Sequence, residues 1–282
     1  MRSRGFSLVE LMVVIAIIAS LVGLSVPILR SSRERARTAV CAGRIKQLLV
    51  GLWSYQTENG TFPYGFQKAS GQTASRDHYA GIAGSVDLAG WWWFDYSQEV
   101  NHATGDGLGV LSCPSKRQSD ALLAVNLLCG NYGANLSVCR VEQYTQPYRD
   151  GFYGEPLSFN QIPQPAETLL LVDSGYSLIS WWHATESPPV QLPPASMMLG
   201  GIQHAAYVPG MGINKDRTLL QGQTDDARGG RHPHKTVNVG FTDAHVATRK
   251  ADEMLVEKTA DSHWDNSPLW QPKPDPVKAA SP

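Results

Sequence analysis

The 282-residue sequence lacks the motifs by which catalytic sites are usually recognised. It has no GxSxG, HExxH, Walker or GxGxxG pattern, so no sequence signal supports a hydrolase, a zinc protease or a nucleotide-dependent enzyme. Charge is also scarce: charged residues make up 17% of the chain and the formal net charge is −1. This balance excludes bulk affinity for nucleic acid, and the 42% of hydrophobic residues excludes a disordered chain. We therefore expect a folded protein that is not an enzyme and has no nucleic-acid partner.

Cysteine is scarce too, and the chain has only four: Cys41, Cys113, Cys129 and Cys139. They form no CxxC pair, which excludes a zinc ribbon, and they are too few for a disulfide scaffold of this size. In an oxidising compartment Cys129 and Cys139 could close a small disulfide loop, and the other two are free to pair as well. Buried free thiols are the alternative.

The chain does contain a long apolar run close to its start. Residues 6–26 carry a single charge, Glu10, and follow a short basic leader at 1–5. A helix over this run is roughly 30 Å long, which matches the hydrocarbon thickness of a bilayer. A cleaved secretory signal peptide is the alternative, but its apolar region is about 7–15 residues long and ends at a small-residue cleavage site. Here the run is longer and Pro27 follows it, so we expect a membrane-spanning helix over 6–27.

The opening string GFSLVELMVVIAIIASL resembles the prepilin signature of type IV pilins and type II secretion pseudopilins. The resemblance implies that a prepilin peptidase in the membrane cuts after Gly5 and that the new N-terminal Phe6 is methylated on its amine. It also implies that Glu10 pairs with the N-terminal amine of a neighbouring subunit during assembly. A carboxylate in lipid costs about 2–3 kcal/mol on insertion scales, and a neighbour's ammonium relieves that cost. Pro27, near the membrane exit, is also a family feature and should kink or loosen the helix because it removes one backbone hydrogen bond.

The same resemblance implies a location and a set of partners. The protein would be a single-pass protein of the bacterial inner membrane, with a cytoplasmic N-terminus and a periplasmic globular domain. Its partners would be copies of itself, other pilins or pseudopilins, the inner-membrane platform of a secretion or pilus machine, and the lipid bilayer. Counting positive charges favours the opposite orientation, since more arginines follow the span than precede it. The leader pattern is the more specific signal, and we follow it.

Beyond the membrane the helix is expected to continue over residues 28–59. Apolar residues recur there at helical spacing, and Gly60 after Asn59 is typical of a helix end. Residues 60–266 read as short strands and long loops. We therefore expect an α+β, pilin-like fold: one long helix, half in the membrane and half amphipathic, packed on a small antiparallel β-sheet. Residues 267–282 contain five prolines and are expected to be a disordered tail.

Four strands can be placed from the sequence. Residues 168–173 read as a buried strand, 176–182 as a second, and 236–241 with 245–249 as a hairpin. The strings LSCPS, NYGAN and FTDAHV also resemble the large pseudopilin-like proteins of planctomycetes, verrucomicrobia and their allies. That family has a glycine where this chain has Ala244, and an alanine forced to positive φ costs about 1–2 kcal/mol.

Polar residues late in the chain are candidates for a metal site. Hydrogen bonding at a turn and a strand edge is the simpler explanation of these residues, but they could also gather as three or four metal ligands across the predicted hairpin: His232, His234, Asp243 and His245. The pair Asp225-Asp226, near two glycines, could favour a hard cation such as Ca²⁺.

Two functions from different classes remain after this reasoning. The first is a structural subunit of a type II secretion pseudopilus or a type IV pilus-like filament. The alternative is a signal-anchored extracytoplasmic protein that binds a glycan or a metal and does not polymerise. Two features motivate this alternative: the histidine cluster late in the chain and two tryptophan runs, at 91–93 and 181–182. Packing in the protein core would also explain the tryptophan runs.

Overall fold

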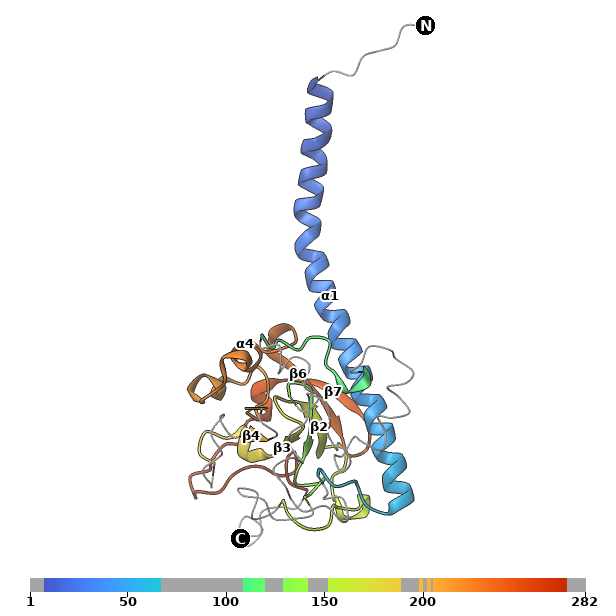
Figure 1. Ribbon diagram of the computed structural model, residues 1–282, viewed down its shortest axis with the longest axis vertical. Helices are drawn as coiled ribbons and strands as arrows, with labels where there is room; N and C mark the ends of the chain where they lie inside the picture. The colour runs from blue at the N-terminus through green and yellow to red at the C-terminus, as the bar shows by residue number, and fades with distance from the viewer. Residues whose placement is uncertain are drawn as a thin grey trace.

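The computed structural model describes residues 8–66, 109–119, 129–141, 152–188, 198–199, 202–203 and 205–272. Its dominant element is α1, Leu8–Asn59, a 52-residue helix whose outer half stands clear of a globular head (Figure 1). The helix runs unbroken through Pro27, where the sequence predicted a kink or loosening. It ends where Gly60 adopts φ 81° and donates its N–H to the carbonyl oxygen of Gln56. The predicted long helix and its terminal glycine are confirmed.

The head is built on a five-stranded sheet in the order β3-β1-β2-β6-β7. The strands are β1 Tyr132–Asn135, β2 Leu169–Asp173, β3 Leu178–Ile179, β6 Thr236–Phe241 and β7 Val246–Lys250. Three neighbouring pairs are antiparallel, whereas β1 and β3 are parallel, so the sheet is mixed and not purely antiparallel as expected. The buried strand at 168–173 and the 236–249 hairpin are confirmed. The strand expected over 176–182 is much shorter, because a 3₁₀ helix begins at Trp181.

Shorter elements complete the head around this sheet. A second sheet pairs β4, Met198–Leu199, with β5, Ile202–Gln203, and a short helix α4 spans Thr224–Gly229. The remaining helical segments are 3₁₀ turns: η2 Gly109–Leu111, η3 Phe159–Gln161, η4 Trp181–Ala184, η5 Gly212–Asp216, η6 Gln221–Gln223, η7 Pro233–Lys235 and η8 Ala251–Met254. The α+β, pilin-like fold class predicted from the sequence is confirmed.

The inner half of α1 packs on β6, β7 and β2 through a single apolar stripe. Its buried members recur at the three- and four-residue spacing of one helix face: Cys41, Ile45, Leu48, Leu49 and Leu52. Opposite them, Gly240 on β6 has no side chain, and a Cβ built there would lie 2.8 Å from Ile45 Cγ2 and 2.7 Å from Leu49 Cδ1. The glycine therefore sets how closely the helix approaches the sheet.

The turn between β6 and β7 also contacts the helix. The Ala244 N–H donates to the Phe241 carbonyl at 2.9 Å, and Ala244 itself has φ 68°. The four residues from Phe241 thus form a hydrogen-bonded β-turn whose last residue is left-handed, a conformation that favours glycine. Two α1 side chains donate to its carbonyls, Lys46 Nζ to Ala244 at 2.7 Å and Trp53 Nε1 to Thr242 at 2.9 Å.

Residues 267–272, which the sequence analysis assigned to a disordered tail, belong to the folded head, and residues 273–282 lie outside the described residues. Trp270 is 1% exposed, and its indole N–H donates to the Met254 carbonyl at 2.9 Å. The Leu269 carbonyl accepts a hydrogen bond from the Leu169 N–H of β2. Prolines after position 267 led the sequence analysis to a disordered segment, but the large apolar pair Leu269-Trp270 anchors its start in the core.

Candidate functional site

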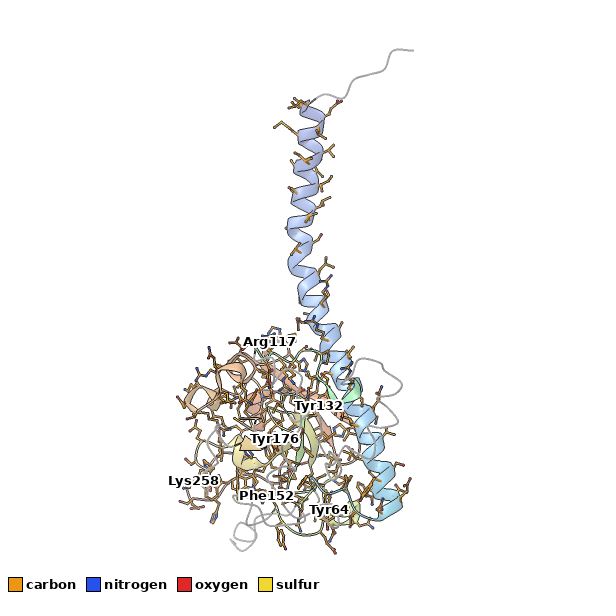
Figure 2. All side chains as sticks on the ribbon, in the orientation of Figure 1. Tyr64, Arg117, Tyr132, Phe152, Tyr176 and Lys258 are labelled. Carbon is orange, nitrogen blue, oxygen red and sulfur yellow. The ribbon has the colours of Figure 1, made fainter. Side chains whose placement is uncertain are left out.

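The outer half of α1 is an apolar surface that the described part of the chain leaves uncovered. Large side chains from Leu8 to Val26 are 40–72% exposed, and the most apolar 18-residue window of the helix has a mean hydropathy of 2.7 with none of it buried. Figure 2 shows the side chains of this part of α1 projecting outward from the helix, at a distance from the head. Glu10 lies in the first turn of α1 and is exposed, whereas Gly5 and Phe6 lie outside the described residues. By length and composition this helix could cross a membrane.

A second constellation is buried in the head, where α1 meets the sheet. We call it the buried polar centre: Cys41 from α1, Cys113 from the segment after η2, Asp173 at the end of β2 and His232 just before η7. All four are buried, and one ligand atom from each lies within 4.8 Å of the others. His232 Nε2 is 3.2 Å from Asp173 Oδ2 and 3.9 Å from Cys113 Sγ, and Cys41 Sγ is 3.4 Å from Asp173 Oδ1.

Neighbouring groups hold these four side chains in place. Thr38 Oγ1 donates to the Glu34 carbonyl and lies 3.2 Å from His232 Nδ1, one helical turn before Cys41. The Asn238 backbone N–H donates to Asp173 Oδ2 at 2.7 Å. The hydroxyl of Tyr132, labelled in Figure 2, donates to Cys41 Sγ at 3.5 Å. Residues from one helix and three strands therefore converge on this point.

A buried ion pair adjoins the centre. The Arg231 guanidinium makes a two-pronged contact with Asp226, with Nη2–Oδ2 at 2.7 Å and Nε–Oδ1 at 2.8 Å. Its remaining N–H groups donate to the carbonyls of Asn131 at 2.6 Å and Ser174 at 2.8 Å. Arg231 Nη1 also lies 3.7 Å from Asp173 Oδ1, so its positive charge faces the centre.

The protonation of the centre follows from these contacts. Burial lowers the pKa of His232, but hydrogen bonds to Asp173 and Cys113 outweigh burial and raise this pKa to about 10. Burial raises the pKa of Asp173, yet His232, Arg231 and the Asn238 N–H together hold it below its usual value. Burial also raises the pKa of Cys113, but hydrogen bonds with Cys41 and His232 bring it down to about 6. The centre thus favours anionic oxygen and sulfur beside cationic nitrogen.

The metal ligands proposed from the sequence do not converge. His234 precedes β6, whereas Asp243 and His245 follow it, and a six-residue strand separates its ends by roughly 17–20 Å. Asp243 and His245 instead form an exposed turn contact, with Oδ1–Nδ1 at 2.6 Å. Within the described part of the chain, His232 is the one of these four that enters a ligand cluster, and its companions are Cys41, Cys113 and Asp173.

The calcium interpretation of Asp225-Asp226 is not supported either. Both carboxylate oxygens of Asp226 are engaged, because they accept from Arg231, from the Tyr207 hydroxyl at 2.9 Å and from the Arg117 N–H at 3.0 Å. A cation would have to displace the Arg231 guanidinium from a fully buried site.

Of the two alternatives for the cysteines, the structure has the buried free thiols, and the tryptophan pair at 181–182 lies in the core. All four cysteines are free and buried. Cys129 and Cys139 lie on either side of the extended strand β1, which holds them apart. Trp181 and Trp182 are 6% and 4% exposed and make edge contacts with each other, so they present no glycan-stacking surface. The run at 91–93 lies outside the described residues.

Sequence reasoning missed the buried polar centre because its members lie far apart in the chain. One signal was available: Cys41 begins the apolar stripe of the helix, and Asp173 ends a buried apolar strand. A carboxylate at the end of a fully buried strand needs a buried partner. The identity of that partner, His232 with Arg231, could come only from the fold.

Comparisons with known proteins concern the N-terminal part. Residues 1–26 match the model of the prokaryotic N-terminal methylation motif. The chain is also 37% identical over 62 residues to the type II secretion system core protein G of Pseudomonas aeruginosa, a match that covers 22% of this chain and 44% of that relative. The chain thus spans less than half the length of that relative, and no solved structure matches it. Together these similarities support a pseudopilin-like or pilin-like protein.

Proposed function

We propose that this pilin- or pseudopilin-like chain is a structural, non-enzymatic subunit of a type II secretion pseudopilus or a type IV pilus-like filament. The observation that carries the proposal is the outer half of α1, where large apolar side chains are 40–72% exposed and Glu10 is the only charged residue from Leu8 to Val26. Such a surface is stable only when lipid or other helices cover it. Lipid would cover it in the membrane, and neighbouring copies would cover it in a filament.

Assembly would depend on processing at the start of this helix. Cleavage after Gly5 by a prepilin peptidase would free the amine of Phe6, and methylation would leave that amine basic. Glu10 of one subunit would then pair with the amine of its neighbour in a low-dielectric setting, where an unpaired carboxylate is costly. The small residues Ala16, Ala19 and Gly23 would permit close helix approach. The pair would therefore select one axial stagger between neighbouring helices.

The head would lie outside the cytoplasm and the leader inside it. In this orientation the partners are the peptidase, other pilins or pseudopilins and the membrane platform of the machine. The alternative is a signal-anchored protein that binds a glycan or a metal and does not polymerise. Its glycan-binding form has less support than the sequence gave it, because Trp181 and Trp182 are buried in the core.

Mass spectrometry of the mature N-terminus tests this proposal. Membrane protein from the native host should begin at N-methylated Phe6. Replacement of Gly5 by leucine should leave the leader attached, so that the chain retains its full length. A functional wild-type protein that still begins at Met1 would contradict processing and, with it, the assembly mechanism.

A further inference from the structure

We propose that the buried polar centre binds one Zn²⁺ ion through Cys41, Cys113, Asp173 and His232, and that this ion fastens α1 to the head. The inference is independent of the filament proposal, because it rests on the buried polar centre and not on the exposed outer half of α1. Its first support is the convergence of four ligand atoms within 4.8 Å of one another.

The spacing of these atoms fits a tetrahedral ion. With Zn–S near 2.3 Å and Zn–N or Zn–O near 2.0–2.1 Å, tetrahedral ligand atoms lie roughly 3.3–3.8 Å apart. The separations are 3.2 Å from His232 Nε2 to Asp173 Oδ2, 3.4 Å from Cys41 Sγ to the other carboxylate oxygen, Asp173 Oδ1, and 3.9 Å from His232 Nε2 to Cys113 Sγ. Only one carboxylate oxygen of Asp173 would bind the ion, so a tetrahedral site requires a rotation of this carboxylate and a contraction of ligand separations that are now at most 4.8 Å, by up to about 1 Å.

The chemistry of the donors selects the metal. Two thiols, one imidazole and one carboxylate suit a borderline-soft ion such as Zn²⁺, whereas Ca²⁺ and Mg²⁺ take oxygen ligands. Four protein ligands in a buried site leave no open position for a substrate, which is typical of a structural zinc. The site therefore calls for a bound ion that stabilises the fold and takes no part in catalysis.

The hydrogen-bond partners of His232 and Asp173 are arranged like those that orient metal ligands in known sites. A metal-bound histidine usually donates its second ring N–H to a fixed acceptor. If Nε2 of His232 binds the ion, Nδ1 faces Thr38 Oγ1 at 3.2 Å, and the hydroxyl hydrogen of Thr38 is already donated to the Glu34 carbonyl. The lone pairs of Thr38 Oγ1 are then free to accept from Nδ1. The Asn238 N–H, 2.7 Å from Asp173 Oδ2, fixes the carboxylate in the same way.

Charge balance supports the same assignment. Two thiolates and a carboxylate around Zn²⁺ leave one net negative charge in a buried space. Arg231 Nη1 lies 3.7 Å from Asp173 Oδ1 and supplies a positive charge on that side.

The four ligands join parts of the chain that are far apart in sequence. Cys41 belongs to α1, while Asp173 and His232 belong to the central sheet and the loop before β6. An ion that holds them together crosslinks the membrane helix to the head across nearly 200 residues, and metal binding then contributes directly to folding.

Metal analysis of the full-length chain tests the proposal. Protein purified in detergent after growth with zinc, and without chelator, should contain about one zinc ion per chain. The variants Cys113→Ser and His232→Gln should each lose most of this metal. The matched control is Cys139→Ser, which removes a buried free thiol outside the centre and should retain it.

A milder variant keeps the test valid if the ligand variants fail to fold. Thr38 is half-buried on α1, and Thr38→Val should leave the fold intact while weakening zinc affinity by roughly 10–100-fold in competition with a chelator. Alkylation of Cys41 and Cys113 should accelerate only after zinc is removed. A folded wild-type chain that takes up no zinc, equal metal content in all variants, or a Cys41–Cys113 disulfide found by mass spectrometry would each overturn the proposal.

Discussion

Gly240 on β6 lies directly beneath Ile45 of α1, and the space between them is too small for a methyl group. A Cβ on Gly240 would approach Ile45 Cγ2 to 2.8 Å, closer than real Cβ atoms come to their neighbours. This contact fixes the seat of the helix on the sheet, just as the hydrogen bonds from Lys46 and Trp53 fix its register along the hairpin turn.

Replacement of Gly240 by valine should therefore lift the helix from the sheet. Overpacking of a tight core typically costs 1–3 kcal/mol, and we expect a loss of about that size in the free energy of unfolding. Denaturant titration followed by tryptophan fluorescence measures it. The control is Gly43→Ala on α1, where an added Cβ has nothing within 4 Å and helix propensity should raise stability by about 0.5–1 kcal/mol. Equal stability of both variants would contradict the close approach.

Replacement of Ala244 by glycine should stabilise the protein. Ala244 has φ 68°, a conformation that costs an L-residue about 1–2 kcal/mol of stability. Glycine avoids this strain, but its greater conformational freedom in the unfolded chain lowers stability by about 0.4–1 kcal/mol. A net gain near 0.5–1 kcal/mol should appear as a higher midpoint of thermal unfolding. Ala247→Gly, in the regular strand β7, should lower the midpoint instead. A drop for both variants would show that the turn is not strained.

Removal of the Asp226 carboxylate should be far more damaging than loss of a surface acid. Asp226→Ala leaves Arg231 buried without its principal partner, which typically costs 3–5 kcal/mol. Chemical denaturation of the purified chain measures the loss. Asp216→Ala provides the comparison, because Asp216 is exposed and its contact with Lys215 is long, so a change within about 0.5 kcal/mol is expected. Similar effects of the two variants would mean that Arg231 finds another partner.

Substitution of Glu10 should separate processing from assembly. Glu10→Ala removes the carboxylate that we assign to a neighbour's amine but leaves the cleavage sequence intact, so the leader should still be removed. Filaments, or crosslinked oligomers in membranes, should be lost. Glu34→Ala, on the same helix beyond the span, removes a carboxylate whose ion pair is with Arg37 of its own helix, and this variant should assemble normally. Normal assembly of Glu10→Ala would rule out the proposed pairing.

The elements with local signals could be predicted from the sequence. The long helix, its end at Gly60, the buried strand ending at Asp173 and the hairpin after Thr236 all follow from periodicity and turn residues. Features that depend on distant contacts could not. The parallel pairing of β1 with β3 and the burial of Trp270 are set by the whole fold, against the local pattern of short strands and prolines.

The buried polar centre illustrates the same limit. Proximity in sequence suggested that His232 acts together with His234 and His245, but strand β6 carries these residues to opposite ends of the hairpin. The other three members of the centre lie 59 or more positions from His232 and give no shared local pattern. By contrast, the exposed apolar run of the outer helix is contiguous, and its character could be recognised without a structure.

The continuity of α1 has a mechanical consequence. At 1.5 Å per residue, the helix is a rod of about 78 Å, gripped by the head at one end and free of it at the other. An unkinked helix transmits an axial displacement along its whole length. If α1 is drawn out of the bilayer by one helical turn, the head therefore moves by about 5.4 Å in the same direction. Force applied at the membrane would therefore reach the distal end of the molecule as motion, with little lost to bending between them.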